Sequence, residues 1–308
     1  MQHSSPTLLI TGGSGFIGSH LARRAVERGF RVFVLSRNPQ AARLRLPASV
    51  HTVKELAALD GVEVNIVVNL AGRNLAEGRW NEQRKREFFE SRVGTTQKLV
   101  DYFQRQGVAA PHLLISGSAV GYYGNHPEPQ PLTEEASCNP SFGHRLCNTW
   151  EQTALQMADL RTRVVLLRTG LVLGRDGGLM QKLKRPFSLG LGGRMGSGKQ
   201  WFPWVHIEDL VDLIFFLIQH QELSGPFNGT APNPVTNAQF TRGLGRALNR
   251  PAFMHMPAAA LKLLFGEMAE ETILQGQRVV PEKALKAGFG FRYPTLELAL
   301  EEVVGSVS

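Results

Sequence analysis

The chain has 308 residues, of which 43% are hydrophobic and 19% charged, and its formal net charge is +8. A chain of this length and composition can bury a sizeable core, which excludes the disordered and fibrous classes. The basic residues are scattered and no groove-reading motif accompanies them, so we expect no nucleic-acid partner. The two cysteines, Cys138 and Cys147, lack metal-type spacing, and we interpret them as reduced thiols in a protein without a metal.

The N-terminal residues do not have the pattern of a targeting segment. An apolar strand begins almost at once, at Thr7, without the basic and long apolar regions of a signal peptide. The most apolar later stretch, residues 210–218, is interrupted by Asp212 and is too short to span a bilayer. We therefore expect a soluble, cytoplasmic protein with no membrane partner.

The first two thirds of the chain alternate between strand and helix patterns. Strands are predicted over 7–10, 31–35, 65–70, 112–116 and 163–167, and helices over 14–28, 80–103 and 142–158. In the helix over 80–103, a helical spacing predicts an inner face made of Phe89, Val93, Thr96, Val100 and Phe103. This alternation predicts an α/β fold, a Rossmann doubly wound parallel sheet with helices on both faces.

The pattern changes after Gly174. Residues 177–198 are rich in glycine and basic residues and are predicted to form a loop, followed by a helix over 205–219 and a strand over 226–229. From Pro232 onward, short helices alternate with glycine- and proline-rich breaks. We predict a Rossmann domain of residues 1–173 and 205–231, and a smaller C-terminal α/β substrate domain of residues 174–204 and 232–308.

A glycine-rich turn connects the first predicted strand to the first predicted helix. Gly12 permits a tight turn, Gly15 lets the backbone approach a pyrophosphate, and Gly18 lets the helix pack on the sheet. The helix N-terminus adds N–H donors and a partial positive charge for a phosphate. This strand–turn–helix context indicates a dinucleotide site. The residues assigned to it in this turn are Gly12, Ser14, Gly15, Phe16, Ile17 and Gly18.

The end of the second strand indicates which dinucleotide is bound. An NAD-selective site places a carboxylate there to bind the ribose 2′-hydroxyl, but this chain has Ser36 and Arg37, and no acidic residue between Arg28 and Glu55. An arginine can bind a 2′-phosphate through charge-assisted, bidentate hydrogen bonds. We predict NADP(H) in preference to NAD(H); the alternative is that Arg37 is a solvated surface residue.

Several motifs together carry a family resemblance. They are residues 11–18, Asn69-Leu70-Ala71-Gly72, Ser116-Gly117-Ser118 with Tyr122-Tyr123-Gly124, Leu167-Arg168-Thr169-Gly170, and shorter segments such as Ser91-Arg92. With them, nearly the whole chain resembles an atypical extended short-chain dehydrogenase/reductase. More specifically, it resembles the nucleoside-diphosphate-sugar epimerase-like family that has a C-terminal domain of unknown function.

The resemblance implies further cofactor-binding residues. Besides Ser36 and Arg37 at the 2′-phosphate, they are Glu55 and Leu56 near the adenine, Leu70, Ala71, Gly72 and Arg73 near the ribose and pyrophosphate, Ser116 on the fifth strand, and Gly170 and Val172 near the nicotinamide. For apolar members of this set, such as Leu70 and Val172, a plain core role is the alternative.

The acid/base residues of active members of the superfamily are incomplete here. A serine orients the substrate oxygen and a tyrosine moves the proton. A lysine four residues later lowers the tyrosine pKa from about 10 and holds the ribose of the cofactor. Ser118 matches the serine, but Phe142 and Leu146 stand at the tyrosine and lysine positions. A shift by one residue gives Gly143 and Cys147, which supply neither group. The candidates for a substitute are Tyr122 first, and then Tyr123, His144, Lys199 and His206.

Two functions therefore stay open. One is an NADP(H)-dependent oxidoreductase or epimerase-like enzyme acting on a hydroxyl or carbonyl of a small, anionic substrate such as a nucleotide sugar, with Ser118 orienting that oxygen. The other is a non-catalytic NADP(H)-binding regulatory or sensor protein. The basic loop with Arg194 and Lys199 fits an anionic substrate and a solvated loop almost equally. In many proteins with this resemblance the helices corresponding to 80–103 and 142–158 form a homodimer face.

Overall fold

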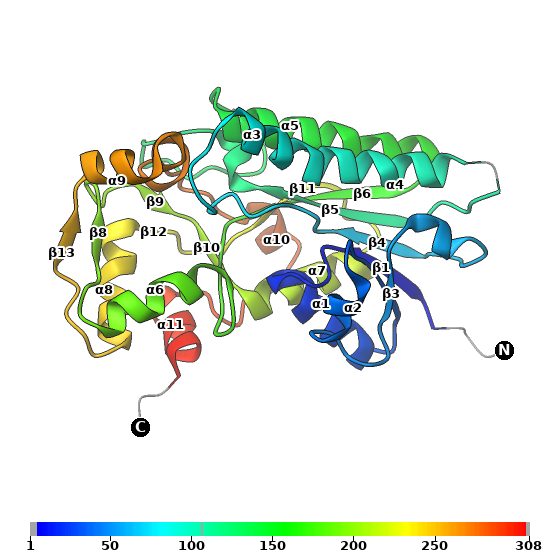
Figure 1. Ribbon diagram of the computed structural model, residues 1–308, viewed down its shortest axis with the longest axis horizontal. Coiled ribbons are helices and arrows are strands. Elements are labelled where there is room, and N and C mark those ends of the chain that lie inside the picture. Colours follow the sequence, from blue (N-terminus) through cyan, green and yellow to red (C-terminus); the bar gives the residue numbers. More distant parts are fainter. Residues whose placement is uncertain (1–4, 106, 306–308) are drawn as a thin grey trace.

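A seven-stranded parallel sheet forms the centre of the computed structural model, which describes residues 5–105 and 107–305 (Figure 1). Its strands are β1 (Thr7–Thr11), β2 (Arg31–Leu35), β3 (His51–Val53), β4 (Ile66–Asn69), β5 (Leu113–Ala119), β6 (Arg163–Thr169) and β11 (Gly225–Gly229). They lie in the order β11-β6-β5-β4-β1-β2-β3, so the strand order reverses beside β1. The predicted doubly wound Rossmann sheet is confirmed.

Helices cover both faces of the sheet (Figure 1). On one face, Leu8 and Ile10 of β1 pack in a core with α1 (Phe16–Glu27) and α7 (Ile207–Gln219). On the other face, Leu9 packs in a core with α4 (Thr95–Gln104) and α5 (Phe142–Leu155). Because successive strand residues point to opposite faces and both are covered, the middle of β1 is a continuous apolar run, Leu8–Ile10.

The long helix predicted over 80–103 is interrupted by a π-helical segment. It consists of α3 (Glu82–Phe89), the π-helical residues Glu90–Gly94, and α4. Thr96, Val100 and Phe103 are buried, as predicted, but Phe88 and not Phe89 is buried upstream. A π-helical turn holds an extra residue and so shifts the helical phase. The predicted inner face is wrong for Phe89 and Val93, which line an outer groove.

The loop predicted over 177–198 is wrong, because it contains α6 (Gly178–Ser188) and the short strand β8 (Gly193–Met195). Met180 and Phe187 of α6 are buried. The glycines that suggested a loop lie at the ends of this helix, while residues 179–185 are mostly good helix formers. Composition averaged over the whole stretch concealed the helix.

The remaining α-helices and strands of the described residues are short. They are α2 (Pro39–Arg43), β7 (Leu171–Leu173), β9 (Trp201–Phe202), β10 (Trp204–His206), β12 (Val235–Thr236), α8 (Asn237–Ala247), β13 (Met254–Met256), α9 (Ala258–Phe265), α10 (Glu282–Lys286) and α11 (Leu296–Val304). A separate core that includes Trp204, Phe240 and Leu300 joins β10, α8 and α11. The two-domain boundaries stay a prediction. Within residues 5–105 and 107–305, every helix is too short or too polar to cross a membrane.

Candidate functional site

The carboxyl ends of the parallel strands bring most of the predicted site residues to one edge of the sheet. The glycine turn follows β1, Ser36 and Arg37 follow β2, Leu70 follows β4, and Ser118 lies near the end of β5. β1 lies between β2 and β4, where the strand order reverses. In open α/β sheets, ligands bind in the crevice outside such a reversal.

The glycine turn is packed so closely that two of its glycines cannot be replaced without displacing backbone. Gly12 has φ of +68°, and a Cβ there would lie 2.5 Å from the Leu70 carbonyl oxygen. A Cβ on Gly18 would overlap the Gly12 carbonyl oxygen and lie 2.6 Å from the Gly13 Cα. Gly15 is exposed at the start of α1, which leaves its backbone open to a ligand. Ser14, Phe16 and Ile17 are half-buried beside it.

The residues predicted to bind the adenosine end lie at the ends of β2 and β3. Ser36 is half-buried, and its hydroxyl accepts the Asn38 N–H at 3.3 Å. Arg37 is exposed and forms no ion pair within the part of the chain that the structure describes. Glu55 is exposed, and Leu56 is half-buried against the core. The roles of these four residues in binding the adenosine end stay predictions.

A chain of hydrogen bonds fixes the loop that leaves β4. The Thr11 hydroxyl donates to the Asn69 side-chain oxygen at 2.5 Å and accepts the Ala71 N–H at 3.2 Å. The Asn69 amide donates to the Thr96 hydroxyl at 2.7 Å. These bonds hold together the ends of β1 and β4 and the start of α4. Beyond them, Leu70 and Ala71 are half-buried, while Gly72 and Arg73 are exposed.

The last three predicted cofactor residues are less accessible. Ser116 is fully buried within β5, 3.5 Å from the Asn69 amide nitrogen. Gly170 follows β6 and is half-buried, and a Cβ there would lie 2.7 Å from the Pro203 carbonyl oxygen. Val172 is half-buried in β7 against the core. Their cofactor roles stay predictions.

Ser118 belongs to a buried polar network that the sequence did not reveal. Its hydroxyl donates to the Glu151 carboxylate at 2.6 Å. Arg168 binds both oxygens of that carboxylate, each at 2.9 Å. All three residues are buried. Although burial acts to lower it, the pKa of Arg168 is raised by its hydrogen bonds to Glu151 and by the charge of that carboxylate. The sequence signal that could have indicated this network was Arg168, a charged residue directly after the apolar residues 164–167 of β6.

The two tyrosines near Ser118 differ in what they can do. The Tyr123 hydroxyl donates to the Asn228 side chain at 2.7 Å and accepts from Arg168 at 3.2 Å. Burial raises the pKa of Tyr123 to about 12, so it cannot serve as a base near neutrality. Tyr122 is half-buried, with the Arg168 Cζ 3.4 Å from its ring centre. Among the described residues, its hydroxyl has no hydrogen-bond partner.

The positions expected for the tyrosine and lysine pair have become part of an apolar cluster. Phe142, the first residue of α5, and Leu146, one turn later, are buried with Trp80, Phe88 and Met268. Neither side chain can move a proton or supply a charge. The structure therefore supports the interpretation that the usual acid/base pair is absent from α5.

The other candidate substitutes are dispersed. The His144 Nδ1 donates to the Tyr122 carbonyl oxygen at 2.6 Å. His206 is fully buried, and its Nε2 lies 2.9 Å from the Glu302 carboxylate in α11. Lys199 is exposed in the loop between β8 and β9. Of these three, only His144 contacts a residue near Ser118: it hydrogen-bonds to the Tyr122 carbonyl oxygen, and its ring meets the Tyr122 ring edge-on, with 5.3 Å between the ring centres.

The two cysteines are unpaired and should differ sharply in reactivity. Cys138 is exposed, whereas Cys147 is buried, and burial raises the pKa of its thiol to about 11. Because the thiolate is the reacting form, iodoacetamide at pH 8 should modify Cys138 alone. Intact-mass spectrometry should show one adduct on the folded chain, none on Cys138→Ser, and two after unfolding in guanidinium. A second adduct on the folded wild type would contradict this.

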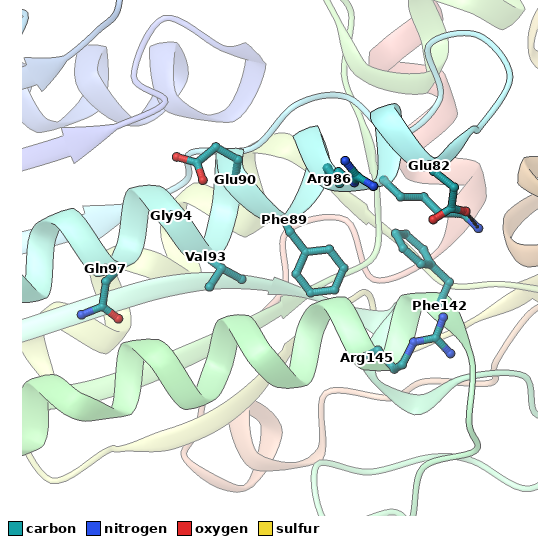
Figure 2. A pocket seen from close by; sticks show the side chains of 10 residues that line it. Glu82, Arg86, Phe89, Glu90, Val93, Gly94, Gln97, Phe142 and Arg145 are labelled. Carbon is teal, nitrogen blue, oxygen red and sulfur yellow. Dashed lines mark hydrogen bonds and ion pairs between the residues drawn. The ribbon is translucent and has the colours of Figure 1, made fainter.

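A groove of about 700 Å³ lies between α3–α4 and α5, on their outer side (Figure 2). Phe89, Val93 and Phe142 form its apolar floor, and charged side chains such as Arg86 and Arg145 border it. It does not include the carboxyl edge of the sheet, so it is separate from the glycine turn.

The fold and its glycine turn define a Rossmann protein of the dinucleotide-binding type. Comparison with known proteins shows to which family the chain belongs. Residues 8–228 match the NAD dependent epimerase/dehydratase family, and residues 256–303 match a domain of unknown function, DUF1731. The chain belongs to this epimerase family, and the expected resemblance is confirmed.

Individual relatives cover almost the whole chain. An epimerase family protein of Mycobacterium bovis, Mb2239, is 39% identical over 96% of this chain and 97% of its own. The human epimerase family protein SDR39U1, solved with NADPH, superposes with a TM-score of 0.87 at 34% identity, over 97% of this chain and 99% of that one. UDP-glucose 4-epimerase of Thermotoga maritima, solved with UDP-glucose, shares the fold at 18% identity, with a TM-score of 0.79 over 97% of both chains.

Proposed function

We propose that this protein binds NADP(H) along the carboxyl edge of its sheet. The observation that carries the proposal is the pairing of the open glycine turn after β1 with Ser36 and Arg37 at the end of β2. Gly15 would receive the diphosphate at the N-terminus of α1, and Arg37 the 2′-phosphate. The NADPH in the solved human relative supports this choice of cofactor.

Replacing Arg37 by methionine should reduce the preference for NADPH over NADH. A charge-assisted hydrogen bond to a phosphate contributes about 1.5–3 kcal/mol, so NADPH affinity should fall by about tenfold or more, while NADH affinity stays nearly unchanged. Isothermal titration calorimetry with both cofactors measures this. Arg23→Met, which removes an exposed arginine on α1, is the matched control. Equal affinities of the wild type for NADH and NADPH would refute the selectivity.

The proposed activity is that of an epimerase-like oxidoreductase acting on a hydroxyl or carbonyl of a small nucleotide-sugar-type substrate. When bound, the cofactor supplies hydride transfer at its nicotinamide ring. Ser118 would orient the substrate oxygen, and Tyr122, whose hydroxyl has no partner among the described residues, is the first candidate to move the proton. The UDP-glucose-bound epimerase of the same fold supports the substrate class.

A second candidate function, a non-catalytic NADP(H)-binding protein, is favoured by one specific observation. The Ser118 proton is donated to Glu151, so the hydroxyl can accept a hydrogen bond but must break this bond to donate one to a substrate carbonyl. The burial of Phe142 and Leu146 adds to this, because α5 supplies no acid/base pair. In this function, cofactor occupancy would shift a conformational equilibrium.

Hydride transfer separates the two functions. The protein is incubated with stereospecifically deuterated NADPH and a panel of nucleotide sugars, aldehydes and ketones, and label transfer is followed by mass spectrometry. Transfer that is lost in Ser118→Ala and Tyr122→Phe, but kept in the exposed control Ser49→Ala, supports the enzyme. Tight NADPH binding without transfer to any of these substrates supports the second function.

We also propose that the protein forms a homodimer through the groove between α3–α4 and α5 (Figure 2). Its apolar floor, including Phe89 and Val93, supports this, because contiguous apolar patches commonly mark interfaces. Val93→Glu should place a charge in that interface and raise the dimer dissociation constant at least about tenfold. Sedimentation velocity measures this, with Leu44→Glu on a remote exposed residue as the control. A monomeric wild type would contradict the proposal.

A further inference from the structure

Arg92 is fixed in place by the hydrogen bonds that order the ends of the strands. It lies in the π-helical segment Glu90–Gly94, and its carbonyl oxygen accepts the Thr96 hydroxyl at 2.7 Å. That hydroxyl in turn accepts from the Asn69 amide at 2.7 Å and from the Trp150 indole at 2.9 Å. The backbone of Arg92 is therefore tied to β4 and to α5, and π-helical insertions of this kind are frequent at functional sites.

The guanidinium of Arg92 lies against the loop that leaves β4. Its Nη2 donates to the Arg73 carbonyl oxygen at 2.9 Å. Its Cζ would lie 3.0 Å from a Cβ built on Gly72, and lies 5.5 Å from the Trp150 ring centre. A side chain at Gly72 would therefore press on the guanidinium, which would have to shift by a few tenths of an ångström. The cation occupies the junction of the β4 loop and α5, beside the region where the proposed cofactor would cross the sheet edge.

This cation has no partner of opposite charge. Within residues 5–105 and 107–305, no carboxylate oxygen lies within 4.0 Å of the Arg92 guanidinium. Its Nη1 donates weakly to the Ser91 hydroxyl at 3.4 Å and to the Phe88 carbonyl oxygen at 3.5 Å, whereas its Nε donates to no acceptor among these residues. Burial lowers the pKa of Arg92 from its ordinary value, and the nearby Cys147 thiol acts in the opposite direction. A partly buried cation is costly unless it is paired and hydrogen-bonded. The unpaired charge of Arg92 and its remaining N–H donors therefore suit an oxygen-rich, anionic ligand.

The lysine expected in α5 is absent, so its role of holding the cofactor is left to another residue. Leu146 stands at that position but is buried in the apolar cluster with Phe142. Trp150, one turn after Leu146 in α5, has its ring centre 5.5 Å from the Arg92 Cζ. A cation from the α3–α4 helix thus reaches the part of α5 from which a lysine would otherwise extend.

We propose that Arg92 binds the ribose–diphosphate part of NADP(H) and replaces the absent lysine as the cation that holds the cofactor. This inference rests on the proposed binding of NADP(H). The ribose–diphosphate is common to NADPH and NADH, so Arg92 should contribute equally to both, unlike Arg37. Its role is to bind and position the cofactor, and it needs no proton transfer.

Calorimetric titration of NADPH and NADH into the full chain tests this. Arg92→Met should weaken both cofactors by a similar factor, about tenfold or more, while Arg92→Lys keeps more of the affinity. Arg37→Met should weaken NADPH alone, and Arg23→Met neither. If Arg92→Met fails to fold by circular dichroism, Arg92→Gln replaces it with the same expectation.

The two proposals fail in distinguishable ways. A folded wild type that binds neither cofactor refutes the proposed function, and the role of Arg92 with it. A wild type that binds NADPH, together with a folded Arg92→Met that binds both cofactors as tightly, refutes the role of Arg92 alone. Weakening of NADPH without weakening of NADH would also refute it, because Arg92 would then act at the 2′-phosphate.

Discussion

Replacing Arg168 by methionine is expected to lower the free energy of unfolding by about 3–5 kcal/mol, because it leaves the Glu151 carboxylate as an unpaired buried charge. Arg168 donates to both oxygens of that carboxylate, to the Tyr123 hydroxyl at 3.2 Å and to the Glu134 carbonyl oxygen at 3.2 Å. No other described cation lies within 4.0 Å of Glu151. Chemical denaturation followed by circular dichroism measures the loss.

A double variant distinguishes lost charge pairing from lost packing. Removing both charges, as Glu151→Leu with Arg168→Met, should recover a substantial part of the lost stability, because no unpaired ion is left buried. Arg175→Met, which breaks an ion pair between the exposed Arg175 and Glu302 in α11, should cost no more than about 1 kcal/mol. Equal losses in the single and double Arg168 variants would contradict the explanation by charge pairing.

The strands could be predicted because a strand that is buried on both faces appears in the sequence as a run of apolar residues. Each of β1, β2, β4, β5 and β6 contains an apolar run of three or four residues, and each was predicted within a few residues of its bounds. The glycine turn was predictable for a related reason. Gly12 and Gly18 are required by backbone contacts within the turn itself, so the constraint is local and appears as a spacing.

Two kinds of feature could not be predicted in this way: those that depend on the phase of a helix, and those that join side chains distant in sequence. The π-helical turn at Glu90–Gly94 changes which residues face inward, yet nothing in a 3.6-residue periodicity marks where a phase shift occurs. The Ser118–Glu151–Arg168 network joins residues that are 17 and 33 positions apart in sequence. The sequence shows three polar residues, whereas only the fold shows that they satisfy one another.

The same limit explains why one cation of the proposed site could be predicted from the sequence and the other could not. Arg37 could be assigned a role because its position at a strand end follows from the pattern of the sheet. Arg92 could not, because its approach to Gly72 depends on the π-helical phase shift and on how α4 packs beside α5. The chain therefore lacks a lysine at the expected position while placing a different cation at the same sheet edge.

Replacing Gly18 by alanine is expected to damage both the fold and cofactor binding. The new Cβ would overlap the Gly12 carbonyl oxygen and lie 2.6 Å from the Gly13 Cα, and backbone atoms cannot rotate away as a flexible side chain can. Overpacking of this kind costs about 1–3 kcal/mol. The displaced turn would also lose backbone hydrogen bonds to a diphosphate, each contributing about 1.5–3 kcal/mol, so NADPH affinity should fall by about tenfold to a hundredfold or more.

Alanine substitutions at two other glycines, Gly15 and Gly290, separate the effect on stability from the effect on cofactor binding. A Cβ on Gly15 would meet only the Gly12 carbonyl oxygen, at 3.1 Å, so Gly15→Ala should nearly keep the stability but place a methyl group where the diphosphate approaches. A Cβ on Gly290 would meet no heavy atom within 4 Å, and the φ of this residue is ordinary, so Gly290→Ala should change neither property. Denaturation and NADPH titration on the three variants check this. Wild-type stability in Gly18→Ala would show that the turn can relax, and wild-type NADPH affinity in Gly15→Ala would place the diphosphate elsewhere.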